Sequence, residues 1–294
     1  MEPVNGMVSV IITTYNRECD ILKRAVESVL SQTYKNIEIL IIDDNKPDYA
    51  GSAQIKQEMS EYDCVRYIKQ PQNMGAQVAR NTGIFAARGE YTAFLDDDDE
   101  WLPQKLEKQL SIFRSNPSAG LVFCNGYRVL VNNSGEQSTT YNPFFKENVT
   151  FSDMLYMDYV GTTTQAMIRR DVFAKAGLFD TDFPARQDYE MWLRISRYYD
   201  VQGCPDKLFK HYIYEGERIS GDPQKGLRGY FSILRKYNQY YRKNAKARSQ
   251  LYFFIEKNYK AAGMKFKGNY YMIKKLMLDP GRIIRKLRKK GDNS

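Results

Sequence analysis

The stretch Phe94-Leu95-Asp96-Asp97-Asp98-Asp99-Glu100-Trp101 places five consecutive carboxylates directly after two apolar residues. Five like charges this close together repel one another, so the arrangement makes sense if a positive charge lies beside them. A hard divalent cation with oxygen ligands is the natural candidate. Residues 91–95 have the pattern of a buried strand, and a metal at the carboxyl end of such a strand suggests a nucleotide diphosphate site.

Three short apolar runs before the acidic stretch also have the pattern of strands, at residues 7–13, 37–42 and 65–68. Residues 76–87 are predicted to be helical, and Gly89 follows them as a C-terminal cap would. Strands that alternate with helices of this length are typical of βαβ units and a parallel sheet. We therefore predict an α/β fold, Rossmann-like, with a mostly parallel central sheet flanked by helices.

The pattern is more mixed after Trp101. It predicts helices at 103–115 and 188–199 and strands at 120–131 and 162–168. After about residue 220 the chain is rich in Lys, Arg and Tyr and has no strand pattern. We expect one or two helices over 225–262 and a last helix that begins at Asp279-Pro280. The predicted organisation is one α/β domain, 1–220, followed by a basic helical extension, 221–294.

The charge of the chain is divided unevenly. Residues 225–294 hold 20 Lys/Arg and three acidic residues, a net of +17, while the first 224 residues hold 24 basic and 32 acidic residues, a net of −8. A basic extension of this kind favours an anionic surface, either nucleic acid or acidic lipid. Because the chain shows no nucleic-acid module, we expect no nucleic-acid partner. Apolar residues between the basic ones (Ile283, Ile284, Leu287) favour an amphipathic helix on an anionic membrane surface.

The chain also lacks an uninterrupted apolar stretch of about 18 residues, so no membrane span is expected. Its four cysteines form no C-x-x-C pair, and no signal peptide precedes them, which predicts reduced thiols in a cytosolic protein. The expected location is therefore cytoplasmic, peripheral at the inner face of the cell membrane.

Polar side chains follow three of the predicted strands. They are residues 13–17 after the first strand, Asp43 and Asp44 after the second, and the acidic stretch after the fourth. In an open α/β sheet, ligands bind outside the carboxyl ends of the strands. The three segments together therefore predict one ligand site at that edge.

With these segments, the chain resembles the family-2 glycosyltransferases, inverting enzymes with a GT-A fold. The resemblance covers about residues 7–220 and rests on five segments in order: VSVIITTYNR (8–17), EILIIDDN (38–45), NMGAQVARNTG (73–83), FLDDDDEW (94–101) and RQDYEMWLR (186–194). It implies that Thr13 and Tyr15 hold the nucleotide base, the tyrosine by stacking. It also implies that Asp44 accepts a hydrogen bond from a uracil ring, which favours a UDP-sugar or dTDP-sugar donor, and that Arg80 lies near the nucleotide.

The acidic stretch and a second aspartate receive the remaining implied roles. Asp96 to Asp98 resembles the D-x-D motif, whose acids face the ribose and the metal; we assign Asp96 and Asp97 to the donor and Asp98 to Mn²⁺ or Mg²⁺, although Asp97 is an alternative metal ligand. Asp188 matches the general base that takes the proton of the acceptor hydroxyl. A bound metal would neutralise the departing diphosphate. The predicted start of a helix at Asp188 would favour its ionised form.

The sequence differs from the family pattern at two places, and it lacks a signature of one subgroup of the family. The family pattern has fewer aspartates in the acidic stretch, and the usual Glu before the base is Gln187 here. The Q-x-x-R-W signature of processive synthases is absent, so we expect addition of a single sugar to a glycan or lipid-linked acceptor, in capsule, O-antigen or exopolysaccharide synthesis. His211, the only histidine, is a further candidate for the metal shell. The alternatives are a sugar-1-phosphate nucleotidyltransferase, disfavoured because residues 13–17 lack glycine, and an inactive scaffold that binds sugar nucleotide.

Overall fold

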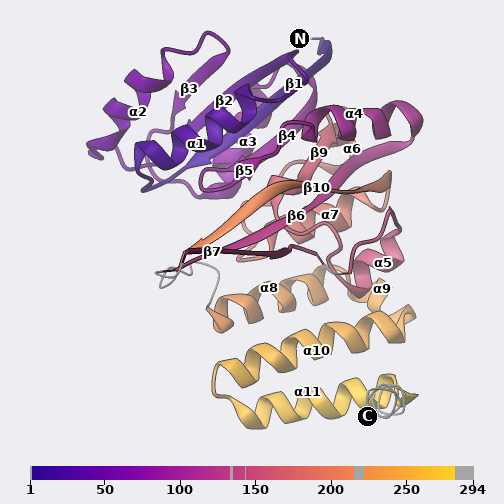
Figure 1. Ribbon diagram of the computed structural model, residues 1–294. Coiled ribbons are helices and arrows are strands. Elements are labelled where there is room, and N and C mark those ends of the chain that lie inside the picture. The colour runs from indigo at the N-terminus through magenta and orange to yellow at the C-terminus, as the bar shows by residue number, and fades with distance from the viewer. Residues whose placement is uncertain (1, 133–134, 143, 215–221, 282–294) are drawn as a thin grey trace.

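The structure is a computed structural model, and it describes residues 2–132, 135–142, 144–214 and 222–281 (Figure 1). Its first half is a regular alternation of strands and helices: β1 (Val4–Thr14), α1 (Cys19–Leu30), β2 (Ile37–Asp43), α2 (Gly51–Met59), β3 (Val65–Lys69), α3 (Ala76–Ala86) and β4 (Gly89–Asp96). These four strands are parallel and lie in the order β3-β2-β1-β4. The predicted βαβ arrangement is confirmed.

The sheet continues through the second half of the domain. The elements that follow β4 along the chain are β5 (Glu100–Trp101), α4 (Lys105–Ser115), β6 (Ala119–Asn132), β7 (Gly135–Thr140), β8 (Asn148–Val149), α5 (Phe151–Tyr156), η1 (Thr163–Gln165), β9 (Ala166–Arg169), α6 (Val172–Ala176), α7 (Gln187–Ile195) and β10 (Asp200–Tyr214). After β4 the order is β9-β6-β10-β5, with β9 antiparallel to both of its neighbours and β10 parallel to β6. The sheet is thus mixed: it is parallel over β3-β2-β1-β4 and between β6 and β10, and its other pairs are antiparallel. The predicted α/β fold with a central sheet flanked by helices is confirmed.

Residues along β1 alternate between two hydrophobic clusters, one on each face of the sheet. Ile11 packs in a cluster with side chains of α3 and α7, whereas Val10 and Ile12 pack with side chains of α1 and α4. A strand covered on both faces is apolar at nearly every position, which is why β1 and β2 can be recognised from sequence. Gly83 lets α3 approach β1 closely, because a Cβ there would lie 2.5 Å from the Ile11 side chain.

Some boundaries differ from the prediction. The strand expected at 162–168 begins only at Ala166, after the short 3-10 helix η1, and the helix expected at 188–199 is α7, which ends at Ile195. The sequence pattern does not predict β10, although this strand lies inside the sheet between β6 and β5.

The described residues after β10 form four helices: α8 (Pro223–Lys236), α9 (Asn238–Lys243), α10 (Ala245–Ala261) and α11 (Lys265–Leu278). The region 225–262 therefore holds three helices where one or two were expected, and α11 was not predicted. Figure 1 shows α8, α10 and α11 stacked in turn below the sheet, with α11 outermost. The helix expected from Asp279 onward falls almost entirely outside the described residues, as do Ile283, Ile284 and Leu287.

Helices α8 to α10 share a hydrophobic cluster with the α/β domain. Tyr230 and Ile233 of α8 and Leu251 of α10 belong to the same cluster as Trp192 of α7. The division of the chain at residue 220 stays a prediction. None of the helices that the structure describes is long and apolar enough to cross a membrane.

Candidate active site

The carboxyl ends of β1, β2 and β4 meet at one edge of the sheet. Thr13 pairs with Ile42 on one side and with Asp96 on the other, and the next residue of β1 pairs with Asp43. The segments that follow these strands therefore lie beside one another. This is the edge at which the sequence predicts a ligand site.

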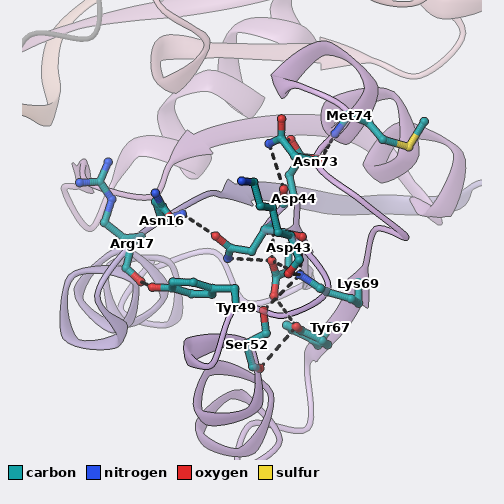
Figure 2. A network of polar contacts seen from close by, with 12 residues as sticks. Asn16, Arg17, Asp43, Asp44, Tyr49, Ser52, Tyr67, Lys69, Asn73 and Met74 are labelled. Atoms are coloured by element: carbon teal, nitrogen blue, oxygen red, sulfur yellow. Dashed lines mark hydrogen bonds and ion pairs between the residues drawn. The ribbon is translucent and has the colours of Figure 1, made fainter.

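The end of β2 is fixed by a buried carboxylate, Asp43. Its oxygens accept hydrogen bonds from Tyr67, from Lys69 Nζ at 3.0 Å and from the backbone N–H of Asn45 at 2.8 Å. Figure 2 shows these side chains grouped around it, with Ser52 beyond. Burial alone would raise the pKa of Asp43, but the hydrogen bonds from Tyr67 and its other neighbours hold it below its usual value. Asp43 therefore orders the loop and leaves ligand contacts to its neighbours.

Asp44 connects the end of β2 to the loop before α3. Its carboxylate accepts hydrogen bonds from Asn73 Nδ2 at 3.0 Å and from the backbone N–H groups of Met74 and Gly75 at 2.8 and 2.9 Å (Figure 2). Gly75 has a φ of +89°, a left-handed conformation that favours glycine. A carboxylate offers about four acceptor positions. Asp44 thus has room for about one further donor.

Tyr15 projects from the end of β1. Asn16 follows it with a φ of 52°, in the left-handed region that asparagine tolerates, and its N–H donates to Asn45 Oδ1 at 2.6 Å. The Tyr15 ring is 46% exposed and lines a surface hollow of about 270 Å³ together with Lys46 and Tyr49. Thr13 is partly buried one position before the end of β1. The ring is therefore free to contact a flat ligand.

Part of the positive charge beside the acidic stretch comes from Arg17. Its Nε lies 3.0 Å from Asp97 Oδ1, and its Nη2 lies 2.8 Å from Asp98 Oδ2. Burial still raises the pKa of Asp97 to about 7 although the charge of Arg17 acts to lower it, and the charges of Asp98 and Asp96 add to the rise. Burial and the charge of Asp96 likewise raise the pKa of Asp98. The stretch remains short of positive charge.

Asp96 and Arg80 form the next contact along the site. Arg80 Nη2 lies 3.2 Å from Asp96 Oδ1, and the Thr163 hydroxyl donates to the same oxygen at 3.1 Å. Arg80 is 9% exposed, and its Nη1 is buried without a hydrogen-bond partner among the described residues. One nitrogen of this guanidinium is thus available for a ligand.

Asp99 is fully buried and faces β10. Its Oδ2 accepts a hydrogen bond from Thr164 Oγ1 at 2.6 Å, and its Oδ1 lies 2.9 Å from His211 Nδ1. Burial raises the pKa of Asp99 to about 6 even though the contact with His211 acts to lower it. Burial would lower the pKa of His211, but the hydrogen bond with Asp99 raises it. Asp99 therefore orients the histidine.

Asp188 occupies the first turn of α7. Burial raises its pKa, although the backbone N–H of Tyr189 and the charges of Arg80 and Arg186 act to lower it. The direction is opposite to the one expected from the helix dipole alone, because burial has the larger effect. Arg186 precedes the helix in a left-handed conformation, with a φ of 59°.

A second carboxylate, Asp158, lies near Asp188 and has no counterpart in the sequence prediction. Burial and the charge of Asp188 raise the pKa of Asp158 to about 7. Its Oδ1 accepts the backbone N–H of Gly161 at 2.9 Å, and the carbonyl of Gly161 accepts a hydrogen bond from Trp192 Nε1 at 2.9 Å. Asp158 is thus close enough to Asp188 for the charge of Asp188 to act on it.

The residues that could hold a metal are the partly exposed carboxylates Asp96 and Asp98, with His211 nearby. Among the residues that the structure describes, no three His, Cys, Asp or Glu side chains are gathered closely enough to form a ready-made site. Carboxylate oxygens are nevertheless the ligands that Mg²⁺ and Mn²⁺ prefer. Burial and the charge of Asp96 raise the pKa of Asp98, and a cation would offset that charge. The donor set fits such a metal chemically.

Comparisons with known proteins agree on one family. The family model described as "Glycosyl transferase family 2" matches residues 9–177. The chain is 30% identical over 243 residues to the putative colanic acid biosynthesis glycosyl transferase WcaA of Escherichia coli, covering 79% of this chain and 82% of that protein. It is 28% identical over 232 residues to an uncharacterised glycosyltransferase of Methanocaldococcus jannaschii, covering 77% and 78%.

The fold also matches solved structures. The crystal structure of S. aureus TarS in complex with UDP-GlcNAc superposes with a TM-score of 0.62 at 16% identity, covering 97% of this chain and 92% of that one. At this identity the likeness concerns the fold alone. It extends over nearly the whole chain.

Proposed function

This chain belongs to glycosyl transferase family 2 and is a glycosyltransferase with a GT-A fold, and from this we propose that it moves one sugar from a UDP-sugar, or a dTDP-sugar, to a glycan or lipid-linked acceptor with inversion. The relationship to WcaA makes polysaccharide assembly, such as capsule, O-antigen or exopolysaccharide synthesis, the setting we favour. TarS binds UDP-GlcNAc, which supports a UDP-sugar donor. We expect the enzyme in the cytoplasm, at the inner face of the cell membrane.

The observation that carries the proposal is the contact of Arg80 with one carboxylate and the effect of its charge on a second, two groups to which we assign different tasks. Its Nη2 contacts Asp96 at 3.2 Å, and its charge also acts on Asp188. Arg80 therefore lies where the donor end of the site meets the base. We infer that its second nitrogen, Nη1, contacts the diphosphate of the donor.

The donor nucleotide is assigned to the ends of β1 and β2. Tyr15, which is about half exposed, stacks its ring on the base, Thr13 helps to hold it, and the remaining acceptor position of Asp44 receives the ring N–H of uracil. Aromatic stacking tolerates any base, so the carboxylate supplies the preference for uracil or thymine. Asp96 and Asp97 complete the donor side.

Asp98 would hold Mn²⁺ or Mg²⁺, with Asp96 and His211 close by, and the bound metal would offset the charge that develops on the diphosphate. Arg17 Nη2 already lies 2.8 Å from Asp98 Oδ2, so a metal would share this carboxylate with Arg17 or displace the guanidinium from it. Arg17 can then remain on Asp97, which it also contacts at 3.0 Å.

Asp188 removes the proton in the transfer step. The acceptor oxygen forms a bond to the anomeric carbon, the bond from that carbon to the diphosphate oxygen breaks, and its electron pair leaves with the nucleotide. The hydroxyl proton passes to Asp188, a contribution that typically amounts to about 10²–10⁴-fold in rate. The partial burial of Asp188 raises its pKa and makes its carboxylate a stronger base than an exposed one.

The test is nucleotide release from a panel of UDP-sugars and dTDP-sugars with Mn²⁺. We expect release from at least one donor, and Asp188→Asn should reduce turnover by about 10²-fold or more while nucleotide binding is retained. Asp182→Asn, an exposed aspartate before the same helix, is the matched control. If Asp188→Asn keeps the turnover of the wild type, Asp188 is not the general base.

The two alternative functions, an inactive sugar-nucleotide-binding scaffold and a sugar-1-phosphate nucleotidyltransferase, predict different results in the same assay. An inactive scaffold would be stabilised by UDP against thermal unfolding without releasing nucleotide from any donor. A nucleotidyltransferase would consume a sugar 1-phosphate and release pyrophosphate. Membership of family 2 argues against that reaction.

A further inference from the structure

The outermost helix, α11, carries a row of apolar side chains that nothing in the described structure covers. Phe266 is 94% exposed, Tyr270 53%, Ile273 55% and Met277 75%. The intervals of four, three and four residues bring all four to one side of the helix. We call these four residues the outer face of α11. Such a row is unusual at a surface, where large apolar side chains are normally scattered singly.

The opposite side of α11 is firmly packed, so the exposure of the outer face does not come from loose placement. Lys275 forms a buried ion pair with Glu256 of α10, and its carbonyl accepts a hydrogen bond from Ser249 Oγ at 3.0 Å. The ring of Tyr271 packs against Tyr252 of α10 with centroids 5.3 Å apart. The helix therefore presents a fixed apolar row to the outside.

Two lysines of α11 flank this row. Lys267 and Lys274 lie on α11 itself, and the ammonium group of Lys274 lies 4.4 Å from the centre of the Tyr270 ring. Residues 222–281 contain 14 Lys/Arg and three acidic residues, and the sequence that follows, 282–294, contains six more Lys/Arg and one acidic residue. Lysines beside an apolar row can extend their amines to lipid headgroups while their stems pack on apolar surface.

We propose that the outer face of α11 lies in the headgroup region of a bilayer that contains anionic lipid, with Phe266 and Met277 inserted and Lys267 and Lys274 on lipid phosphates. A helix that lies in the interface typically pairs an apolar face with basic residues in this way. None of the described helices could cross the bilayer, so this contact would be peripheral.

A second copy of the chain fits the outer face less well. Four side chains expose at most a few hundred Å², below the ~800 Å² per partner of a typical specific interface. Two copies would also bring two strongly basic surfaces together, and the resulting repulsion opposes association. An anionic lipid surface removes that repulsion and attracts each basic residue near it.

Vesicle flotation of the full chain tests the proposal. The wild type should float with vesicles of phosphatidylglycerol and phosphatidylcholine and stay behind with phosphatidylcholine alone. The double variant Phe266→Ser/Met277→Ser should bind at least about ten-fold more weakly, because two inserted apolar side chains are lost. Since both residues are largely exposed, the fold should be unaffected. Lys267→Gln/Lys274→Gln should weaken binding and reduce its dependence on salt.

The matched control is Phe85→Ser on α3, a phenylalanine that is 74% exposed on a different part of the molecule. It should float like the wild type. A second measurement locates the contact: a tryptophan introduced by Tyr270→Trp should be quenched by brominated lipids. Binding is read without any turnover, so a failed donor screen would not affect this result.

Three outcomes would overturn the proposal. The first is a wild type that stays out of the anionic vesicle fraction, and the second is a Phe266→Ser/Met277→Ser variant that floats as well as the wild type. The third is a wild-type dimer in analytical ultracentrifugation that the same double variant converts to monomer, which would make the outer face a contact between copies.

Discussion

His211 Nδ1 lies 2.9 Å from Oδ1 of Asp99, and this contact joins β10 to the acidic stretch across the sheet edge. When Asp99 is ionised, its carboxylate can only accept, so Nδ1–H is the donor and the lone pair of the neutral ring is on Nε2. A histidine oriented in this way by a carboxylate is a common metal ligand. The charges of Asp96 and Asp98 also act on the His211 ring, as expected for neighbours at one site.

His211→Ala should therefore raise the Mn²⁺ concentration needed for half-maximal nucleotide release by about 10–100-fold, with less effect on donor affinity. Asp99→Asn should shift the metal requirement in the same direction, because an amide no longer fixes the tautomer. Titration of release activity with Mn²⁺ measures both. An unchanged metal requirement in His211→Ala would exclude the histidine from the metal site.

Asp97 should make the metal-free protein less stable as pH rises. Its pKa is raised by burial to about 7 in the folded protein, whereas an unfolded aspartate has a pKa of about 4. The folded state therefore holds the proton more tightly, and its stability falls as pH rises from about 4 to about 7. The free energy of unfolding of Asp97→Asn, relative to that of the wild type, should be about 2 kcal/mol greater at pH 8 than at pH 5.

Urea unfolding at the two pH values, with chelator present, measures that difference. Asp182→Asn, an exposed substitution, should show none. A difference between Asp97→Asn and wild type that does not change with pH would mean that Asp97 is already ionised at pH 5.

Two buried threonines should respond differently to the same substitution. Thr164→Val removes the 2.6 Å hydrogen bond to Asp99 and should lower the free energy of unfolding by about 1–3 kcal/mol. Thr92 on β4 is also fully buried, but its hydroxyl has no hydrogen-bond partner among the described residues. Thr92→Val should leave stability unchanged or raise it by about 1 kcal/mol. Equal losses in both variants would indicate that packing, and not the hydrogen bond, decides the outcome.

The pKa of the base, Asp188, should determine the pH below which kcat falls. Burial raises the pKa of Asp188, so kcat should fall as pH decreases through a value above that of an ordinary aspartate. Arg186 acts to lower this pKa, and Arg186→Gln should therefore move the acidic fall in kcat to higher pH. The kcat profile between pH 4 and 8 measures the shift. If kcat of Arg186→Gln falls at the same pH as in the wild type, a group other than Asp188 limits the rate at low pH.

The fold was predictable where burial makes a strand apolar throughout. β1 and β2 are enclosed on both faces, and their sequences show it directly. β10 lies equally deep in the sheet, but its sequence contains Gly203, Pro205 and Lys207. Its register against β6 shifts on both sides of Lys207, so no continuous two-residue period survives for a pattern to detect.

The site was predictable to the extent that strand ends determine it. Asp44, Asp96 and the acidic residues after it follow directly from where β2 and β4 stop. The contact of Arg17 with Asp97 depends on the path of the chain after β1. Asp158 lies in a turn after α5, where an aspartate that caps the Gly161 N–H looks like any other turn residue.

The stacked helices α8, α10 and α11 also determine how far the base, Asp188, would lie from a bilayer that α11 contacts. The Arg186 guanidinium beside the base lies 3.8 Å over the Tyr230 ring of α8, whose other neighbour is Phe254 of α10, with centroids 5.4 Å apart; α11 packs beyond α10. Packed helices lie about 8–10 Å apart, so the base would stand roughly 20–30 Å above a bilayer that holds the outer face of α11. A lipid bearing one sugar would end short of Asp188, and a longer glycan would reach it. Turnover on vesicle-bound acceptors should therefore begin only above a minimum glycan length, and the same acceptors freed of lipid should show no such threshold.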